Sequence, residues 1–125
     1  MKIVVTMARV LVGLVFVVFG LNIFLQFLHQ PPPPIGPAGD FVKALFVSHY
    51  VYAVGALQII GGALLLAGRF VPLGLTLLGP VIVNILLLHI LLNPTGLPIA
   101  IVVAVLTLIV LWHHRASFAG LLQAK

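Results

Sequence analysis

Four long apolar runs, separated by breaks rich in proline and glycine, constrain this chain more than any other feature. The runs cover residues 10–28, 50–67, 70–92 and 97–112. At 1.5 Å per residue they would form helices of about 24 to 35 Å, which matches a bilayer hydrocarbon core of roughly 30 Å. Proline, which cannot continue a helix, follows the first run as "PPPP" and the third as "NP". The sequence predicts an all-α fold, a four-transmembrane-helix bundle, in a single integral membrane domain over residues 1–125.

Composition agrees with a membrane protein. Hydrophobic residues make up 63% of the chain and charged residues only 6%, against about 25% charged residues in soluble domains. The net charge of +5 comes from scattered cations that form no basic stripe, so nucleic acid is not expected as a partner. The chain has no cysteine, which excludes disulfides and thiolate metal sites within it.

The distribution of cations predicts the topology. With four spans, both termini and the turn at 68–71 share one side of the membrane. That side would carry five cations and the other only Lys43; the five are Lys2, Arg9, Arg69, Arg115 and Lys125. The positive-inside rule then places both termini in the cytoplasm. We expect the protein in the inner (plasma) membrane. The basic, apolar N-terminus is similar to a signal peptide, but its apolar run is too long for one, which favours a retained helix.

The segment 38–49, "AGDFVKALFVSH", is too polar at its edges to belong to a span. Asp40 can cap a short helix in which Phe41, Leu45 and Phe46 face one side and Lys43 another. We expect an amphipathic helix at the outer membrane interface, hinged to the second span near Ser48. The alternative is a frayed start of that span.

Polar side chains interrupt the apolar runs. Asn22, Gln26 and His29 follow an i, i+4, i+7 spacing and therefore share one helix face. Lipid would leave their hydrogen-bonding groups unsatisfied, so this face should look into the bundle. Gln58 lies among glycines on the second run, and Asn84 lies in the third.

The helix rise puts Asn22, Gln58 and Asn84 roughly 10–13 Å below the outer ends of their helices. Three spans would thus bring carboxamides to one level of an outward-opening site, with Gln26 and His29 above. His89 is rotated about 140° from Asn84 on an ideal helix and pairs more naturally with Asn93, four residues on. Neutral carboxamides and imidazoles suit a quinone-like or lipidic ligand better than an ion. Alternatively, these groups only hydrogen-bond across helices and set the packing.

Metal, haem and catalytic sites have less support. Two of His29, His49 and His89 could ligate a haem iron from facing helices, but no HxxxH pair exists on one helix. Asp40 is the single acidic residue, so the chain has no carboxylate pair for acid–base catalysis. We therefore predict no catalytic residues and no metal ligands.

Three stretches resemble the DoxX family of small bacterial membrane proteins: "GLVFVVFGLN", "LLAGRFVPL" and "NILLLH". The resemblance extends over roughly residues 7–118. It implies a four-helix membrane bundle and an association with oxidoreductase assemblies, since named members include a thiosulfate:quinone oxidoreductase subunit and part of an oxidative-stress membrane complex. Many relatives carry glutamate where this chain has Gln58, which argues against a proton-coupled role at this position.

Our functional hypothesis is a DoxX-like membrane subunit that binds a quinone-like or lipidic molecule in the outer half of the bundle, next to a redox partner. The ligand-binding residues would be Asn22, Gln26, His29, Gln58, Asn84 and His89. The alternative is a non-catalytic membrane scaffold, in which small residues such as Ala100 and Ala104 support contacts within the chain or in a homo-oligomer. A solute permease is disfavoured because only Thr76 and Thr107 interrupt the apolar inner half.

Overall fold

The computed structural model describes residues 2–28, 32 and 35–124, and all of its regular elements are helices. They are α1 (Lys2–Leu25), α2 (Pro37–Val47), α3 (Tyr50–Ala67), α4 (Val71–Leu91), η1 (Pro94–Gly96), α5 (Leu97–His113) and η2 (Arg115–Leu122). Four helical segments are long and apolar enough to cross a membrane: α1, α3, α4 and the continuous η1–α5. This confirms the expected all-α fold with four helices of membrane-spanning length and apolarity, a composition that suggests a multi-pass membrane protein.

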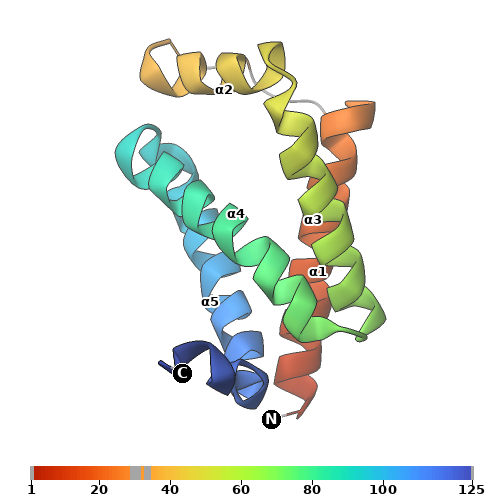
Figure 1. Cartoon of the computed structure of the whole chain (residues 1–125). Helices are drawn as coiled ribbons and strands as arrows, with labels where there is room; N and C mark the ends of the chain where they lie inside the picture. The colour runs from red at the N-terminus through yellow and green to blue at the C-terminus, as the bar shows by residue number, and fades with distance from the viewer. Residues whose placement is uncertain (1, 29–31, 33–34, 125) are drawn as a thin grey trace.

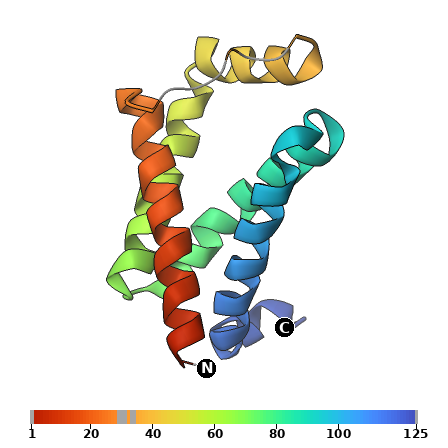
Figure 2. The same ribbon diagram turned by 180° about the vertical axis from the view of Figure 1, so that it is seen from behind.

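The four long helices form two pairs (Figures 1 and 2). α1 lies along α3, whereas α4 starts against α3 and runs across to α5, to which η1 connects it. The pairs approach each other at the end that carries both termini and the α3–α4 turn, and they diverge toward the other end, where α2 runs across the top of Figure 1. We call these the terminal end and the α2 end.

The boundary of α1 differs from the expected span. The helix stops at Leu25, and Gln26 takes a left-handed conformation with φ 51°. Asn22 is therefore about 4.5 Å below the end of α1 by helix rise, closer to it than the sequence predicted. A left-handed residue is a common way for a helix to end, so α1 terminates before it reaches the prolines.

Two glycines allow α1 and α3 to touch through their backbones. A Cβ atom added to Gly62 would lie 2.8 Å from the carbonyl oxygen of Gly13, and one added to Gly13 would lie 2.8 Å from the oxygen of Gly62. Any larger residue at either position would have to push one helix away from the other. Van der Waals packing at such small-residue contacts is a main source of helix association in membranes.

The adjacent glycine makes the same contact with a different helix. A Cβ atom on Gly61 would lie 3.2 Å from the oxygen of Gly74 in α4 and 2.6 Å from a side-chain carbon of Leu78. The Gly61–Gly62 dipeptide thus places α3 directly between α1 and α4.

Arg9 ties α1 to the end of α3. Its guanidinium donates hydrogen bonds to the backbone oxygens of Leu65 and Leu66, the latter at 3.3 Å. These carbonyls belong to the last turn of α3, where partners from the same helix run out and a positive charge is favourable. The guanidinium also lies against Gly68, which ends the helix with φ 70°. Arg9, which the sequence presented as a topology signal, is therefore also a helix cap.

The apolar core is concentrated toward the terminal end. It is built from buried residues of all four long helices: Ala8, Val12, Phe16, Leu65, Val71, Leu75, Leu78, Val81, Ile82 and Val110. Toward the α2 end, large apolar side chains of α4 and α5 such as Leu87, Ile90 and Ile99 are exposed. The buried contacts between the pairs are therefore concentrated at the terminal end, while apolar side chains are exposed along the whole bundle.

The segment predicted as an interfacial helix is helical. It forms α2, and a turn at Ser48–His49 separates it from α3, with His49 at φ 63°. Lys43 lies on α2, whereas Arg9, Arg69 and Arg115 lie at the terminal end. The amphipathic position of α2 at a membrane interface, and the side on which the termini lie, stay predictions.

We predict that Gly62→Ala destabilises the fold by about 1–3 kcal/mol, because the new methyl group meets backbone atoms that cannot rotate away. Reversible unfolding in mixed detergent micelles measures this effect. Gly79→Ala is the matched control, since a Cβ atom there has no neighbour within 4 Å. Equal losses in the two variants would contradict a backbone contact between α1 and α3.

Candidate functional site

Asn22 is buried, with 9% of its surface exposed. Its side-chain oxygen Oδ1 accepts a hydrogen bond from the backbone N–H of Leu28 at 2.8 Å. That N–H lies beyond the end of α1, so the bond holds the chain as it leaves the helix. Asn22 faces inward as predicted, but one of its polar atoms serves the local backbone.

Gln58 is the other buried polar residue of the described chain, at 8% exposure. It lies on the side of α3 where α1 makes its close contact, and a Cβ atom on Gly20 of α1 would be 3.1 Å from the Cβ of Gln58. Its carboxamide forms no hydrogen bond to another described residue. The structure therefore places an uncharged amide among packed helices, as predicted from the neighbouring glycines.

Asn84 has a different environment. Its side chain is exposed, and its amide nitrogen donates to the oxygen of Pro80 at 2.8 Å within the same helix. The structure does not bury it with Asn22 and Gln58. Thr76 and Thr107 form the same kind of bond, to the oxygens of Pro72 and Val103, which satisfies their hydroxyls within their own helices.

His89 is half-buried near the end of α4 that lies toward the α2 end. Its Nδ1 lies 3.0 Å from the backbone oxygen of Asn93, so the predicted pairing occurs through the main chain. A carbonyl can only accept, so Nδ1 carries a proton and donates it, while Nε2 has no hydrogen-bond partner in the described chain. The ring also packs directly on Gly96, where a Cβ atom would overlap it.

The two remaining predicted residues do not join this group. Gln26 is exposed on the turn after α1, where its backbone N–H donates to the oxygen of Asn22 at 2.8 Å. His29 lies outside the described residues. The early end of α1 is the reason that Gln26 no longer shares a helix face with Asn22.

A row of stacked rings joins α1 and α3 near the α2 end. Phe24 stacks on Tyr52 with ring centroids 5.2 Å apart, and His49 also stacks on Tyr52, at 5.7 Å. Such pairs add roughly 0.5–1.5 kcal/mol beyond area burial. The sequence analysis missed this row, because stacking across two helices has no signature along one chain.

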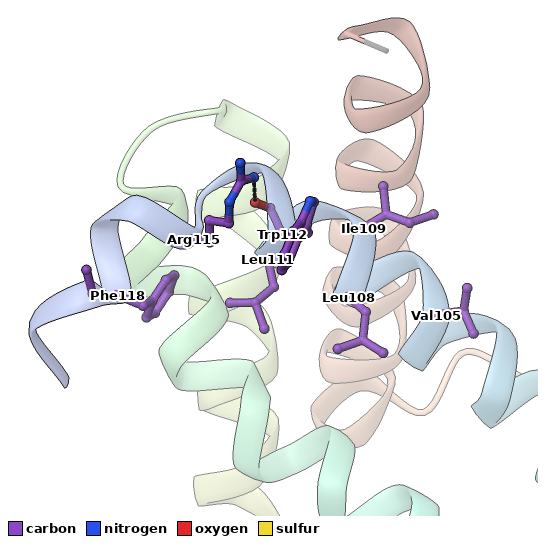
Figure 3. Close-up of a pocket in the computed structure, with 8 residues that line it drawn as sticks. Val105, Leu108, Ile109, Leu111, Trp112, Arg115 and Phe118 are labelled. Atoms are coloured by element: carbon purple, nitrogen blue, oxygen red, sulfur yellow. Dashed lines mark hydrogen bonds between the residues drawn. The ribbon is translucent and has the colours of Figure 1, made fainter. Parts of the chain in front are cut away.

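The structure also has a groove at the terminal end that the sequence analysis did not predict. It has a volume of about 620 Å³ and lies between α5 and η2 (Figure 3). Its walls are apolar except for one guanidinium, and its lining residues are Val105, Leu108, Ile109, Leu111, Trp112, Arg115, Phe118 and Ala119. The sequence feature that could have indicated this groove is the amphipathic segment after residue 114, which lies beyond the last apolar run.

His114 lies beside this groove, just after the end of α5. Burial, and after it the positive fields of His113 and Arg9, hold the pKa of His114 below its usual value of 6.5. Both effects disfavour the protonated ring. His114 is therefore neutral at pH 7 and brings no charge to this end of the protein.

Metal binding has no support in the described part of the chain. No group of three or more His or acidic residues lies close enough to hold an ion there. The bundle presents neutral amides and one imidazole, which can exchange hydrogen bonds with carbonyl and hydroxyl groups of a ligand.

We predict that Asn22→Ala lowers the free energy of unfolding by about 1–2 kcal/mol, because the N–H of Leu28 loses its acceptor. Asn84→Ala is the matched control and should change it by less than about 0.5 kcal/mol, because the side chain is exposed. Unfolding in mixed micelles compares the two variants. A larger loss at Asn84 would show that its amide contacts another helix.

The lowered pKa of His114 predicts a pH-dependent stability. The unfolded chain takes up this proton more readily than the folded one, so stability falls as the pH drops through 6.5 toward the lower folded-state pKa. The variant His114→Gln lacks this titration. As the pH is lowered, the thermal unfolding midpoint of the variant should rise relative to that of the wild type. A difference between the two midpoints that does not change with pH would contradict the lowered pKa of His114.

Comparison with known proteins found no matching family model, no similar curated protein and no similar solved structure.

Proposed function

We propose that this multi-pass membrane protein binds a neutral quinone-like or lipidic molecule in the half of its bundle toward α2, as a membrane subunit that works with a redox partner. The observation that carries the proposal is Gln58, a residue at 8% exposure whose carboxamide has no hydrogen bond to another described residue and is not itself fully buried, so a ligand can still reach it. A buried polar group in a membrane protein costs free energy unless it is paired, and such groups tend to mark functional sites.

Other polar groups of this half keep unused bonding capacity. Within the described chain, the amide nitrogen of Asn22, the amide oxygen of Asn84 and Nε2 of His89 form no hydrogen bond. The amides and the imidazole can exchange hydrogen bonds with the carbonyl and hydroxyl oxygens of a quinone or quinol head group. An ion is a poorer match, because the four long helices carry no Lys, Arg, Asp or Glu at this end.

The surrounding surface suits an apolar molecule. Toward the α2 end, the exposed side chains of α4 and α5 are almost all aliphatic. The two helix pairs diverge here, and α2 crosses the same end (Figure 2). An isoprenoid or acyl tail can therefore lie along these helices while its head group reaches the amides.

The wider setting of the proposal comes from the sequence. Cations at the terminal end favour cytoplasmic termini in an inner membrane, which puts the ligand in the outer leaflet. The association with an oxidoreductase rests on the resemblance to the DoxX family alone.

A packing scaffold is the second candidate, and one observation favours it. Asn22, Asn84 and His89 each spend one hydrogen bond on a nearby backbone group. In this case the polar residues shape the ends and bends of helices, and the protein acts through contacts with other proteins.

The two candidates differ in the effect of Gln58→Leu. We predict that the variant binds decylubiquinone at least about tenfold more weakly than the wild type, because one buried hydrogen bond to the ligand is lost. Calorimetric titration of protein in lipid nanodiscs measures the affinity, and extraction of the purified protein measures the quinone that it retains.

Thr76→Val is the matched control, since it also removes one polar group, from the exposed side of α4, and its hydroxyl bonds only to Pro72. It should bind as the wild type does. Wild-type protein that neither retains nor binds quinone or extractable lipid would overturn the proposal and leave the scaffold.

A further inference from the structure

The groove between α5 and η2 presents an apolar wall that ends in a positive charge. Along α5 the wall runs from Val105 to Trp112, about 10 Å by helix rise, or two-thirds of the roughly 15 Å of hydrocarbon in one leaflet. Phe118 of η2 forms the opposite wall near the mouth (Figure 3). The groove thus has the length and polarity to hold a stretch of acyl chain.

Arg115 stands at the corner where α5 meets η2. Its guanidinium carbon lies 4.5 Å from the centre of the Trp112 ring, and Nη1 donates to the backbone oxygen of Trp112 at 2.8 Å. These two contacts fix the orientation of an exposed side chain and use one of its five N–H donors. The other donors form no hydrogen bond within the described chain, so they can reach an anionic group.

No acidic side chain lies near this arginine in the described chain. Asp40 is the single acidic residue of the sequence, and it lies on α2, at the opposite end. A second copy of this chain in the same orientation would bring another Arg115 and no counter-ion, so a homodimer through this groove would bring like charges together. An occupant that joins an apolar chain to an anionic head is the complementary one.

We propose that the groove binds an anionic phospholipid of the leaflet at the terminal end, with an acyl chain along α5 and the phosphate on Arg115. Arginine recognises phosphate through paired N–H donors, and Trp112 suits the interface between head groups and chains. This site is separate from the proposed quinone site, because it lies at the other end of the bundle.

Trp112 reports on the groove directly, because it is the single tryptophan of the chain and lines the wall. The protein is reconstituted in dioleoyl phosphatidylcholine vesicles that contain increasing fractions of dibrominated phosphatidylglycerol or, in a parallel series, dibrominated phosphatidylcholine. Bromine quenches tryptophan on contact, so the two curves give the relative affinity for the two lipids. We expect a preference of about fivefold for phosphatidylglycerol, from one arginine near a phosphate.

Arg115→Gln should reduce this preference to about one, because the phosphate loses its partner. Arg69→Gln is the matched control, since it removes an exposed charge from the α3–α4 turn at the same end and should leave the preference unchanged. Equal losses in both variants would mean a diffuse surface charge and overturn the site.

The wild-type curves alone can also refute the proposal. Equal, strong quenching by both lipids would mean that the groove takes any phospholipid. Weak quenching by both would mean that protein covers it, as in a complex with a partner or a second copy. Raised salt should lower the preference if Arg115 acts through its charge.

Discussion

The contact on which the structure depends is the close approach of three backbones at Gly61 and Gly62. These adjacent residues point to different sides of α3, one toward Gly74 of α4 and the other toward Gly13 of α1. In a lipid environment, apolar surface gains little from leaving lipid for protein, so helices associate through such close packing and through hydrogen bonds. Arg9 adds the hydrogen bonds near the terminal end, where it caps α3 from α1. Together these contacts fix α3 between its two neighbours.

This arrangement gives the two ends of the protein different properties. The terminal end combines the glycine contacts, the apolar core and most of the cations, whereas the α2 end combines diverging helix pairs with neutral polar groups. A closely packed end and a more open end are compatible with the proposed ligand site in the half toward α2. The groove between α5 and η2 adds to this difference between the ends. It carries a positively charged side chain at the packed end, whereas the uncharged polar groups lie toward the other end.

The candidate site was partly predictable. The burial of Asn22 and Gln58 follows from the cost of exposing an amide to lipid, and the structure buries both. Asn84 was expected beside them, but its side chain is exposed. It can be exposed because its amide nitrogen donates to the oxygen of Pro80 in the same helix. The pairing of His89 with Asn93 followed from helical spacing. The end of α1 at Leu25 could not be predicted from the sequence, because it depends on the left-handed conformation of Gln26 and on the hydrogen bond between Asn22 and Leu28.

The sequence alone determined that the chain forms four helices of membrane-spanning length. The length of an apolar run, its hydrophobicity and the prolines that end it are local properties, and they decide segment by segment whether a helix can cross a bilayer. Only the tertiary structure decided which helices pair, which glycines touch, and which atom each polar side chain bonds. Those outcomes depend on backbone groups from distant parts of the chain, such as the carbonyls of Leu65 and Leu66 that receive Arg9. Every residue offers a backbone carbonyl, so no pattern of side chains marks the ones that a folded chain will use.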